Sequence, residues 1–552
     1  MGQFAPCRMR LKQVDNPWLS RLMLAYNQKD HPIHSMYEYN PFDENDYKNR
    51  LKYLEEREDL ARREELTRIL RSYHTPELLH PAVESNLERL RKPGTLVVIG
   101  GQQAGLMTGP LYTIMKAVAL IHLARKEEKR LGRPVVPVFW IAGEDHDLDE
   151  VDHIWVQDAQ AHPIRHRLPY DQKGKYPISS LKITPQQLHG WLDELSLILP
   201  DSEFKEEWLS QCKQLISEPV SWSRYFARLM HFLFGKWGLL LIDASYPDLR
   251  QFEKPFFQQL IKKSREVNQK VMAASSALEQ MGYDTSVEMH EQKMNLFVQI
   301  DGERHLLYRN DDHCFTKDGF HRFTLEELLN QLEKHPEIFS NNVVTRPLMQ
   351  EFLFPTLLFV GGPGEVAYWG LLKEAFRELG LKMPIVYPRP SFLIVDRRVQ
   401  KRMHQFALTC SDLLTDLERK KQEWLEEQTS WTLSSLFEEM KHRVSELYQS
   451  LSQVLDEEIG MDLPVMVEKN KQKVWEQIDF LNHYAERQLA LKYETELRRW
   501  DELIQSILPR KRPQERVYNI LSVWNQHGIE WLDQLMEDAP AYRRNELQLI
   551  IM

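Results

Sequence analysis

Short apolar runs, each followed by a glycine-rich or polar turn, recur through the first 390 residues. Five of these runs have the length and composition of buried strands: Thr95–Ile99, Pro134–Ala142, Gly238–Asp243, Pro355–Val360 and Pro384–Tyr387. Between the first two, apolar positions in Leu111–Lys129 recur at helical spacing. Strand, helix and strand in this order predict a βαβ unit, and therefore a parallel sheet with a right-handed crossover.

The regions between these strands have patterns of their own. Residues 1–92 and 186–236 are predicted to be mainly helical, and 154–185 a small β excursion. Asn295–Ile300 and His305–Arg309 are predicted to form a β-hairpin, with Asp301-Gly302 in its turn. A helix, Val366–Leu379, is expected after the fourth strand.

The pattern changes after Pro390. Residues 391–508 carry apolar positions at 3/4 spacing among many charges, which predicts two long antiparallel helices reversing near Gly460–Pro464. The expected domains are N-terminal helices with the first half of the sheet (1–153), an insertion (154–235), the second half of the sheet with a hairpin excursion near 295–345 (236–390), the antiparallel coiled coil (391–508) and a helical cap (509–552).

Composition narrows the class of protein. The formal net charge is −10, which argues against a broad nucleic-acid-binding surface. The four cysteines lie far apart, so we expect neither a disulfide framework nor a structural metal site. No run approaches the ~18 apolar residues of a membrane span, and the N-terminus lacks a signal-peptide core. A cytoplasmic globular enzyme without a membrane or nucleic-acid partner is expected.

The first candidate site is the glycine-rich turn Gly100–Pro110. Such a turn lets backbone approach a ligand, and the following helix begins with free N–H groups. It matches neither the P-loop nor the dinucleotide-binding pattern. The alternative is a tight turn required only for packing. The candidate residues are Gly101, Gln102, Gln103, Thr108, Gly109, Tyr112 and Lys116.

The second candidate site follows the second strand. Glu144, Asp145, His146 and Asp147 lie where ligands bind in open α/β sheets, at the carboxyl end of a strand. Such a cluster can hold an ammonium group or transfer protons. The alternative is a solvated acidic loop that caps a helix.

The third candidate site follows the fourth strand. Glycines 361, 362 and 364 suit a backbone nest, and Glu365, Tyr368 and Trp369 lie on the first turns of the next helix. One of the two aromatic residues is expected to pack in the core. Arg389, beyond the fifth strand, is a candidate clamp for a carboxylate or phosphate, or else an ordinary surface arginine. Together the candidates are Gly361, Gly362, Gly364, Glu365, Tyr368, Trp369 and Arg389.

Five blocks of sequence resemble one family, the cysteine-adding enzymes of bacillithiol biosynthesis. They are IGGQQAGLMTGPLYTIMKA, PVVPVFWIAGEDHDLDEVDH, NVVTRPLMQ, FVGGPGEVAYWGLLKEAF and PRKRPQERV, in this order. The resemblance implies a Rossmann-like core related to class I aminoacyl-tRNA synthetases, with a connecting insertion and a C-terminal coiled coil that forms a homodimer. The implied reaction joins cysteine to the amine of glucosaminyl malate in the last step of the pathway.

The resemblance to class I synthetases is incomplete in the first block. Their His-Ile-Gly-His motif corresponds to Met107-Thr108-Gly109-Pro110, which keeps the glycine and lacks both histidines. The cofactor is therefore unassigned, with ATP or another nucleotide as a candidate. In this hypothesis Asp145 or His146 is the base, backbone N–H groups hold the anion, and Lys116 and Arg389 add positive charge.

Two other interpretations fit the same features. One is a nucleotidyltransferase that forms an adenylated intermediate for another use. The other is a nucleotide-responsive scaffold that recruits partners through residues 391–508. For the coiled coil, pairing with the returning helix is the alternative to homodimerisation.

Overall fold

The computed structural model describes residues 9–171, 174–284, 287–311, 313–428, 433–458, 463–538 and 544–552. They form two compact units. Residues up to Val395 and the C-terminal segment Pro509–Met552 make up the first unit, and Asp396–Leu508 make up the second. The candidate site lies wholly within the first unit.

The first unit is built on a five-stranded parallel sheet with the strand order β15-β14-β2-β3-β8. All five predicted strands are present, as β2 (Leu96–Gln102), β3 (Val135–Ile141), β8 (Leu240–Asp243), β14 (Thr356–Gly361) and β15 (Ile385–Pro388). The predicted Rossmann-like α/β class is therefore confirmed. The strand order reverses beside β2, and the crevice at this point is where such sheets bind ligands.

Two glycines at the end of β2 let its neighbours approach closely. A Cβ atom on Gly101 would lie 2.4 Å from the Trp140 carbonyl oxygen of β3. One on Gly100 would lie 2.9 Å from the Val360 oxygen of β14. Part of the glycine content of the first candidate turn therefore serves strand packing.

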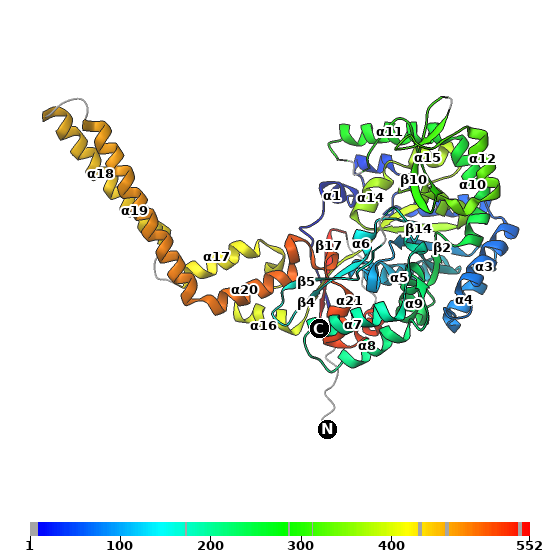
Figure 1. The fold of residues 1–552 in the computed structure, drawn as a ribbon, viewed down its shortest axis with the longest axis horizontal. Coiled ribbons are helices and arrows are strands. Elements are labelled where there is room, and N and C mark those ends of the chain that lie inside the picture. The colour runs from blue at the N-terminus through cyan, green and yellow to red at the C-terminus, as the bar shows by residue number, and fades with distance from the viewer. Residues whose placement is uncertain are drawn as a thin grey trace, which may run out of the picture. The chain divides into compact units, whose positions relative to one another are not determined.

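Helices surround this sheet (Figure 1). Helix α5 packs against β2 and β3, α2 against β14, and α3 and α4 against β8. Their bounds are α2 (Glu44–Glu56), α3 (Leu60–His74), α4 (Pro81–Arg91) and α5 (Tyr112–Leu131). The other helices are α1 (Arg21–Tyr26), α6 (Leu148–Val151), α7 (Pro185–Ile198), α8 (Lys205–Gln214), α9 (Trp222–Phe234), α10 (Pro247–Lys262), α11 (Ser264–Gln280), α12 (Leu325–Lys334), α13 (Thr345–Leu353), α21 (Ile520–His527) and α22 (Glu530–Glu537).

The predicted hairpin belongs to an antiparallel sheet of order β12-β11-β10-β9-β13. Asp301 and Gly302 both have positive φ, 52° and 84°, as a tight hairpin turn requires. The strands are β9 (Lys293–Ile300), β10 (Glu303–Arg309), β11 (Cys314–Thr316), β12 (Arg322–Phe323) and β13 (Phe339–Asn341). The excursion at 154–185 contains β4 (His153–Gln157), β5 (Pro163–Arg167) and β6 (Lys182–Ile183), and β6 pairs with β7 (Val220–Ser221).

Three predictions of local structure were wrong. Residues 391–395 are strand β16 (Ser391–Val395) rather than the start of the coiled coil, and the predicted helical cap also contains strand β17 (Glu546–Ile551). Both pair in a third sheet, in which β17 also binds β1 (Arg10–Asp15) within the predicted N-terminal helical region. The predicted helix 366–379 is interrupted at Gly370, giving α14 (Pro363–Trp369) and α15 (Lys373–Glu378).

The second unit is helical, and its two longest helices form an antiparallel coiled coil. Lys441 Nζ lies 2.5 Å from Asp479 Oδ1, and the Tyr448 hydroxyl lies 2.5 Å from Asn470 Oδ1, so the residues pair in opposite directions. The predicted coiled coil is confirmed, although most of the expected reversal lies outside the described residues. The helices are α16 (Arg397–Gln405), α17 (Leu417–Glu427), α18 (Leu433–Glu458), α19 (Leu463–Lys492) and α20 (Glu494–Ile507).

None of the described helices has the length and apolar content needed to cross a membrane.

Candidate active site

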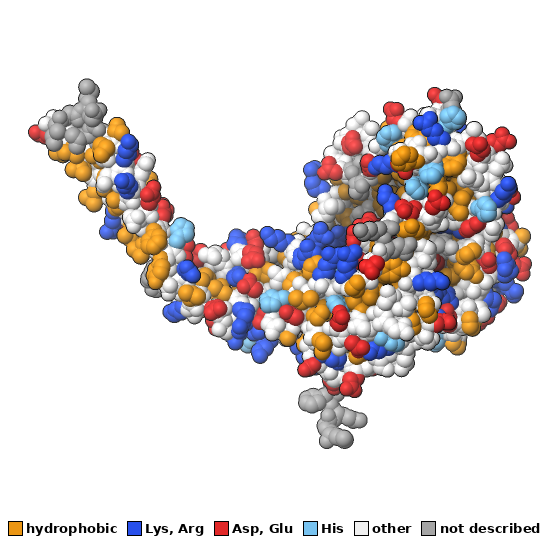
Figure 2. Space-filling model, viewed as in Figure 1, with side chains coloured by type: hydrophobic (Ala, Val, Ile, Leu, Met, Phe, Trp, Pro, Cys, Tyr) orange, Lys and Arg blue, Asp and Glu red, His pale blue; other side chains and the backbone are white. Residues whose placement is uncertain are grey.

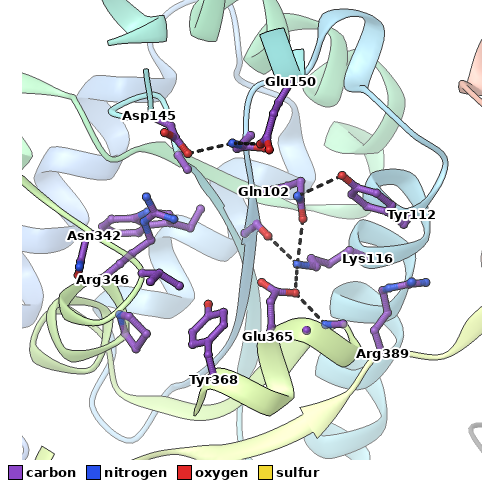
Figure 3. Close-up of a pocket in the computed structure, with 18 of the residues that line it drawn as sticks. Gln102, Tyr112, Lys116, Asp145, Glu150, Asn342, Arg346, Glu365, Tyr368 and Arg389 are labelled. Atoms are coloured by element: carbon purple, nitrogen blue, oxygen red, sulfur yellow. Dashed lines mark hydrogen bonds and ion pairs between the residues drawn. The ribbon is translucent and has the colours of Figure 1, made fainter. Parts of the chain in front are cut away.

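A cleft of about 1040 Å³ opens at the carboxyl ends of β2, β3 and β14 (Figure 3). All three predicted turns contribute to its lining, although the third lies more than 200 residues after the second in the sequence. The predicted residues that line it are Gly101, Gln102, Gln103, Tyr112, Lys116, Asp145, His146, Gly362, Gly364, Glu365, Tyr368 and Arg389.

Lys116 and Glu365 form an ion pair between the first and third turns. Lys116 is 1% exposed, and its Nζ donates to Gly101 O at 2.6 Å, Gln102 Oε1 at 3.2 Å and Glu365 Oε2 at 2.5 Å. The same Glu365 oxygen accepts the Gly362 N–H at 2.7 Å. Burial lowers the pKa of Lys116, and Glu365 opposes this effect. The pair therefore fixes the ends of β2 and β14 relative to each other.

On the β3 side, one amide group holds two carboxylates. Gln103 Nε2 donates to Asp145 Oδ2 at 2.9 Å and to Glu150 Oε2 at 2.8 Å, and both acids face the cleft (Figure 3). Burial tends to raise the pKa of Asp145, but nearby arginines and hydrogen bonds hold it below its usual value. Asp145 is therefore ionised at neutral pH and suited to binding a cationic amine.

His146 contacts a buried arginine. Arg304 is 3% exposed, and its Nη1 lies 3.2 Å from His146 Nδ1. Because a guanidinium group has only N–H donors, Nδ1 must be the acceptor and the proton of a neutral His146 must be on Nε2. Burial lowers the pKa of His146, and Arg304 lowers it further. This geometry favours Asp145 over His146 as the proton acceptor, with His146 as a hydrogen-bond donor.

Arg304 is itself held rigidly between two elements. Its Nε donates to Ser340 Oγ at 2.9 Å, and a second nitrogen donates to the Asn341 carbonyl. Its guanidinium carbon lies 3.7 Å from the centre of the Phe297 ring. The β9–β10 hairpin and β13 thus place this cation beside the acidic turn.

Glu144 does not line this cleft, contrary to its prediction as a catalytic residue. It is 1% exposed, pairs with Arg250, and accepts a hydrogen bond from Arg346 Nε at 3.0 Å. Arg346 does line the cleft. The buried Arg250 and the partly buried Arg346 compensate the charge of Glu144. Its carboxylate therefore holds Arg346, an arginine that lines the cleft, from outside the cleft.

Thr108 and Gly109 are also outside the cleft. Both are buried, and Asn519 Nδ2 donates to the carbonyls of Met107 at 2.7 Å and Gly109 at 2.6 Å. The second half of the glycine-rich turn is covered by the C-terminal segment, so its backbone does not cradle a ligand.

Three further predicted residues do not reach the cleft. Gly361 is within β14 and accepts the Arg389 N–H at 2.7 Å. Trp369 is 1% exposed and stacks on Phe359 with ring centres 4.1 Å apart, so it is the aromatic residue that packs in the core. Asp147 is exposed at the start of α6.

Arg389 lines the cleft, but its charge is already compensated. Its two terminal nitrogens donate to the two carboxylate oxygens of Glu515 at 2.9 and 2.7 Å, and both side chains are buried. It joins the strand end to the C-terminal segment and is not a free clamp for an anion.

The sequence interpretation missed several polar side chains that line the cleft. They are Arg304, Asn342, Arg346, Gln350, Arg512 and Arg516. They come from a hairpin, from α13 and the segment before it, and from the C-terminal segment. No short local sequence pattern identifies them. All of them except Arg304 lie in the blocks NVVTRPLMQ and PRKRPQERV, which carried the resemblance and could have pointed to them.

No group of three or more His, Cys, Asp or Glu side chains suited to a metal ion is present in the described part of the chain.

Two sequence models of one family cover almost the whole chain. The model of the N-terminal Rossmann-like domain of the bacillithiol biosynthesis protein BshC matches residues 9–390. That of its C-terminal coiled-coil domain matches residues 392–550. The chain belongs to the BshC family. The resemblance found in its motifs is thereby confirmed.

Individual BshC relatives align along nearly their full length. A protein of Bacillus cereus (strain B4264) is 35% identical over 533 residues, which cover 96% of this chain and 98% of the relative. One of Bacillus thuringiensis subsp. konkukian (strain 97-27) is 35% identical over 531 residues, covering 96% and 97%. Both carry the name "Putative cysteine ligase BshC".

Proposed function

We propose that this chain is a cysteine ligase, which joins the carboxyl group of cysteine to the amine of glucosaminyl malate in the last step of bacillithiol biosynthesis. The observation that carries the proposal is the pair of carboxylates, Asp145 and Glu150, held by one amide group at the rim of a large polar cleft. Family membership and the names of the relatives support it.

In the proposed step, the substrate amine attacks the carbon of an activated cysteinyl group. The C–N bond forms as the bond to the leaving group breaks, and the amine loses one proton. Asp145 accepts that proton, because its carboxylate is ionised and faces the cleft. The Nε2–H of His146 is free to donate a hydrogen bond to the acyl oxygen, where negative charge develops.

Purified protein tests this proposal directly. Cysteine and glucosaminyl malate are supplied with ATP, another nucleotide or a cysteinyl thioester, and the amide product is measured by mass. Asp145→Asn should lower kcat about 100-fold or more, the usual contribution of a positioned acid or base. Asp149→Asn is the matched control on the adjacent helix α6, because Asp149 is exposed and outside the cleft. Absence of product with every donor would refute the proposal.

We also propose that the chain forms a homodimer through the coiled coil. The returning helix covers one face of α18, where Phe437 is 6% exposed. Another face remains apolar and exposed, and Figure 2 shows orange side chains along this helix pair. Its residues on α18 are Leu436, Met440, Leu447, Leu451 and Val454. Exposed apolar rows of this length are typical of interaction surfaces.

No feature of the described residues favours the nucleotidyltransferase or the scaffold interpretation over the ligase. Pyrophosphate exchange that depends on an acid other than cysteine would favour the first. Rescue of a deletion strain by residues 391–508 alone would favour the second.

A further inference from the structure

Six cationic side chains line the cleft, and four of them are already engaged. Lys116 pairs with Glu365, Arg346 with Glu144, Arg389 with Glu515, and Arg304 with Asp145 at 3.6 Å. The other two are Arg512 and Arg516, which are exposed. Neither guanidinium group has an ion pair or hydrogen bond within the described part of the chain. Recognition of an anionic ligand in this cleft therefore falls to these two residues.

The segment that carries them is rigidly attached. Both residues lie in the anchored loop, which we define as residues 509–519. The Gln514 side chain donates to Ile394 O at 3.0 Å and accepts the Ile394 N–H at 2.9 Å. Glu515 binds Arg389 through both oxygens.

Further along the loop, the Tyr518 carbonyl accepts the Leu111 N–H at 2.8 Å. Asn519 binds the turn that precedes α5 through two carbonyls. The backbone of the loop is thus held by contacts to Arg389, to Ile394 and to the turn before α5, so ligand binding has to order only the two arginine side chains.

The position of Arg516 relates this loop to the acidic side of the cleft. Burial raises the pKa of the Tyr112 phenol, while the nearby Arg516 charge lowers it and the Glu365 and Glu150 charges raise it. The phenol oxygen of Tyr112 also accepts a hydrogen bond from Gln102 Nε2 at 3.4 Å. The same cleft is therefore lined by two arginines without ion pairs and by the two carboxylates, Asp145 and Glu150, that suit an amine.

This combination selects a ligand with one amine and two negative charges. In glucosaminyl malate the amine is on the sugar ring, and the malyl group attached to that ring carries two carboxylates. Each planar carboxylate matches one planar guanidinium group, which can donate two parallel hydrogen bonds.

Resting on the proposed function, we propose that Arg512 and Arg516 bind the two carboxylates of the malyl group, while Asp145 and Glu150 face the amine. The two arginines then set specificity for the acceptor substrate. They do not take part in bond formation.

Steady-state kinetics of the full chain separates this role from a catalytic one. Arg512→Gln and Arg516→Gln should each raise KM for glucosaminyl malate about tenfold, as loss of a charged hydrogen-bonded contact predicts, with kcat within about twofold. The KM for cysteine should not change. Lys511→Gln is the matched control, because Lys511 is exposed in the same loop and does not line the cleft. An unchanged KM for glucosaminyl malate in the double variant would overturn the proposal.

Binding measurements with fragments of the substrate test the proposal without requiring catalysis. L-malate, D-glucosamine and inorganic pyrophosphate are titrated separately into wild type and the double variant, and calorimetry or ligand-observed NMR is used. Malate should bind the wild type but not the double variant, whereas glucosamine should bind both. This result supports the malyl site even if no ligase product forms. In that case the proposed function fails and the proposed binding site does not. Absence of malate binding to the wild type, or an arginine effect on pyrophosphate alone, would contradict the inference.

Discussion

At the scale of single residues, the contact between Arg304 and His146 determines where a proton resides. Burial lowers the pKa of Arg304 to about 10, so its guanidinium group is still protonated at neutral pH and can only donate. The 3.2 Å contact with Nδ1 therefore requires the Nε2–H form of His146.

We predict that Arg304→Gln raises the pKa of His146 toward its ordinary value of 6.5, because a nearby positive charge is removed. Histidine-labelled protein followed by NMR across pH 5–8 measures both the pKa and the tautomer. Arg304→Lys, which keeps a cation, is the matched control and should shift the pKa less. An unchanged pKa and an unchanged Nε2–H form in Arg304→Gln would contradict the assignment.

The sign of the accompanying pH effect on stability follows from the same shift. The folded-state pKa of His146 lies below the unfolded value, so the unfolded chain binds a proton first as pH falls below about 6.5. Stability therefore decreases as pH falls from about 6.5 to the folded-state pKa. This pH window should be narrower in Arg304→Gln. The difference between the denaturant midpoints at pH 7 and pH 5.5 should therefore be smaller in the variant than in the wild type.

At the scale of secondary-structure elements, glycine has different roles in β2 and α14. The Cβ position of Gly101 is 2.4 Å from a backbone oxygen of the adjacent strand, which cannot move aside as a flexible side chain could. Gly364 lines the same cleft, yet a Cβ atom there would meet no atom within 4 Å.

We therefore predict that Gly101→Ala destabilises the first unit by about 2 kcal/mol or more, since a methyl group is forced against a β-strand. Gly364→Ala should be neutral or stabilising by up to about 1 kcal/mol, because alanine is favoured over glycine inside a helix. Denaturant unfolding followed by tryptophan fluorescence compares the two variants. Equal effects at both positions would show that close strand approach is not what requires glycine in β2.

The sequence predicted those elements whose signal is local. Strands β2, β3 and β14 are runs of apolar residues that end in glycine-rich or acidic turns, so both the strands and the site-forming ends could be identified. Strands β1, β16 and β17 are equally short, but their pairing joins residues near position 10, 391 and 546. No local pattern encodes a pairing between such distant segments.

The candidate site was predictable to a similar extent. Asp145, Lys116 and Glu365 lie directly at strand ends or on the helices that follow them, where ligand-binding residues are expected. Arg304 and Arg512 come from a hairpin and from the anchored loop, whose proximity to the cleft depends on the completed fold. Conversely, Thr108 was selected because of its glycine neighbours, although burial beneath Asn519 decides its role.

At the scale of the whole molecule, the first unit is assembled from both ends of the chain. The chain leaves this unit after Val395 and returns at Pro509. The returning segment is the anchored loop, which supplies Arg512 and Arg516 to the cleft. The coiled coil is therefore an insertion between two parts of one site-forming unit, and truncation of the chain before Pro509 would remove part of the cleft.

Self-association through the coiled coil is the last prediction. Leu447 is 70% exposed and Leu451 is 47% exposed, and neither is covered by the returning helix. Burial of a leucine contributes about 1.5–3 kcal/mol, so Leu447→Glu with Leu451→Lys should weaken a symmetric dimer at least about a hundredfold. Sedimentation velocity of the full chain should then show a dimer for wild type and a monomer for the variant, with unchanged helix content.

The control for this experiment substitutes polar positions of the same helix. Glu446 and Ser450 are exposed, and their double replacement by lysine changes charge without removing apolar surface. That variant should remain dimeric, because the hydrophobic row is intact and surface charges contribute little. A monomeric wild type at tens of micromolar would instead mean that pairing of α18 with α19 satisfies the coiled coil within one chain. Loss of the dimer in the control alone would assign association to charged residues rather than to the apolar row.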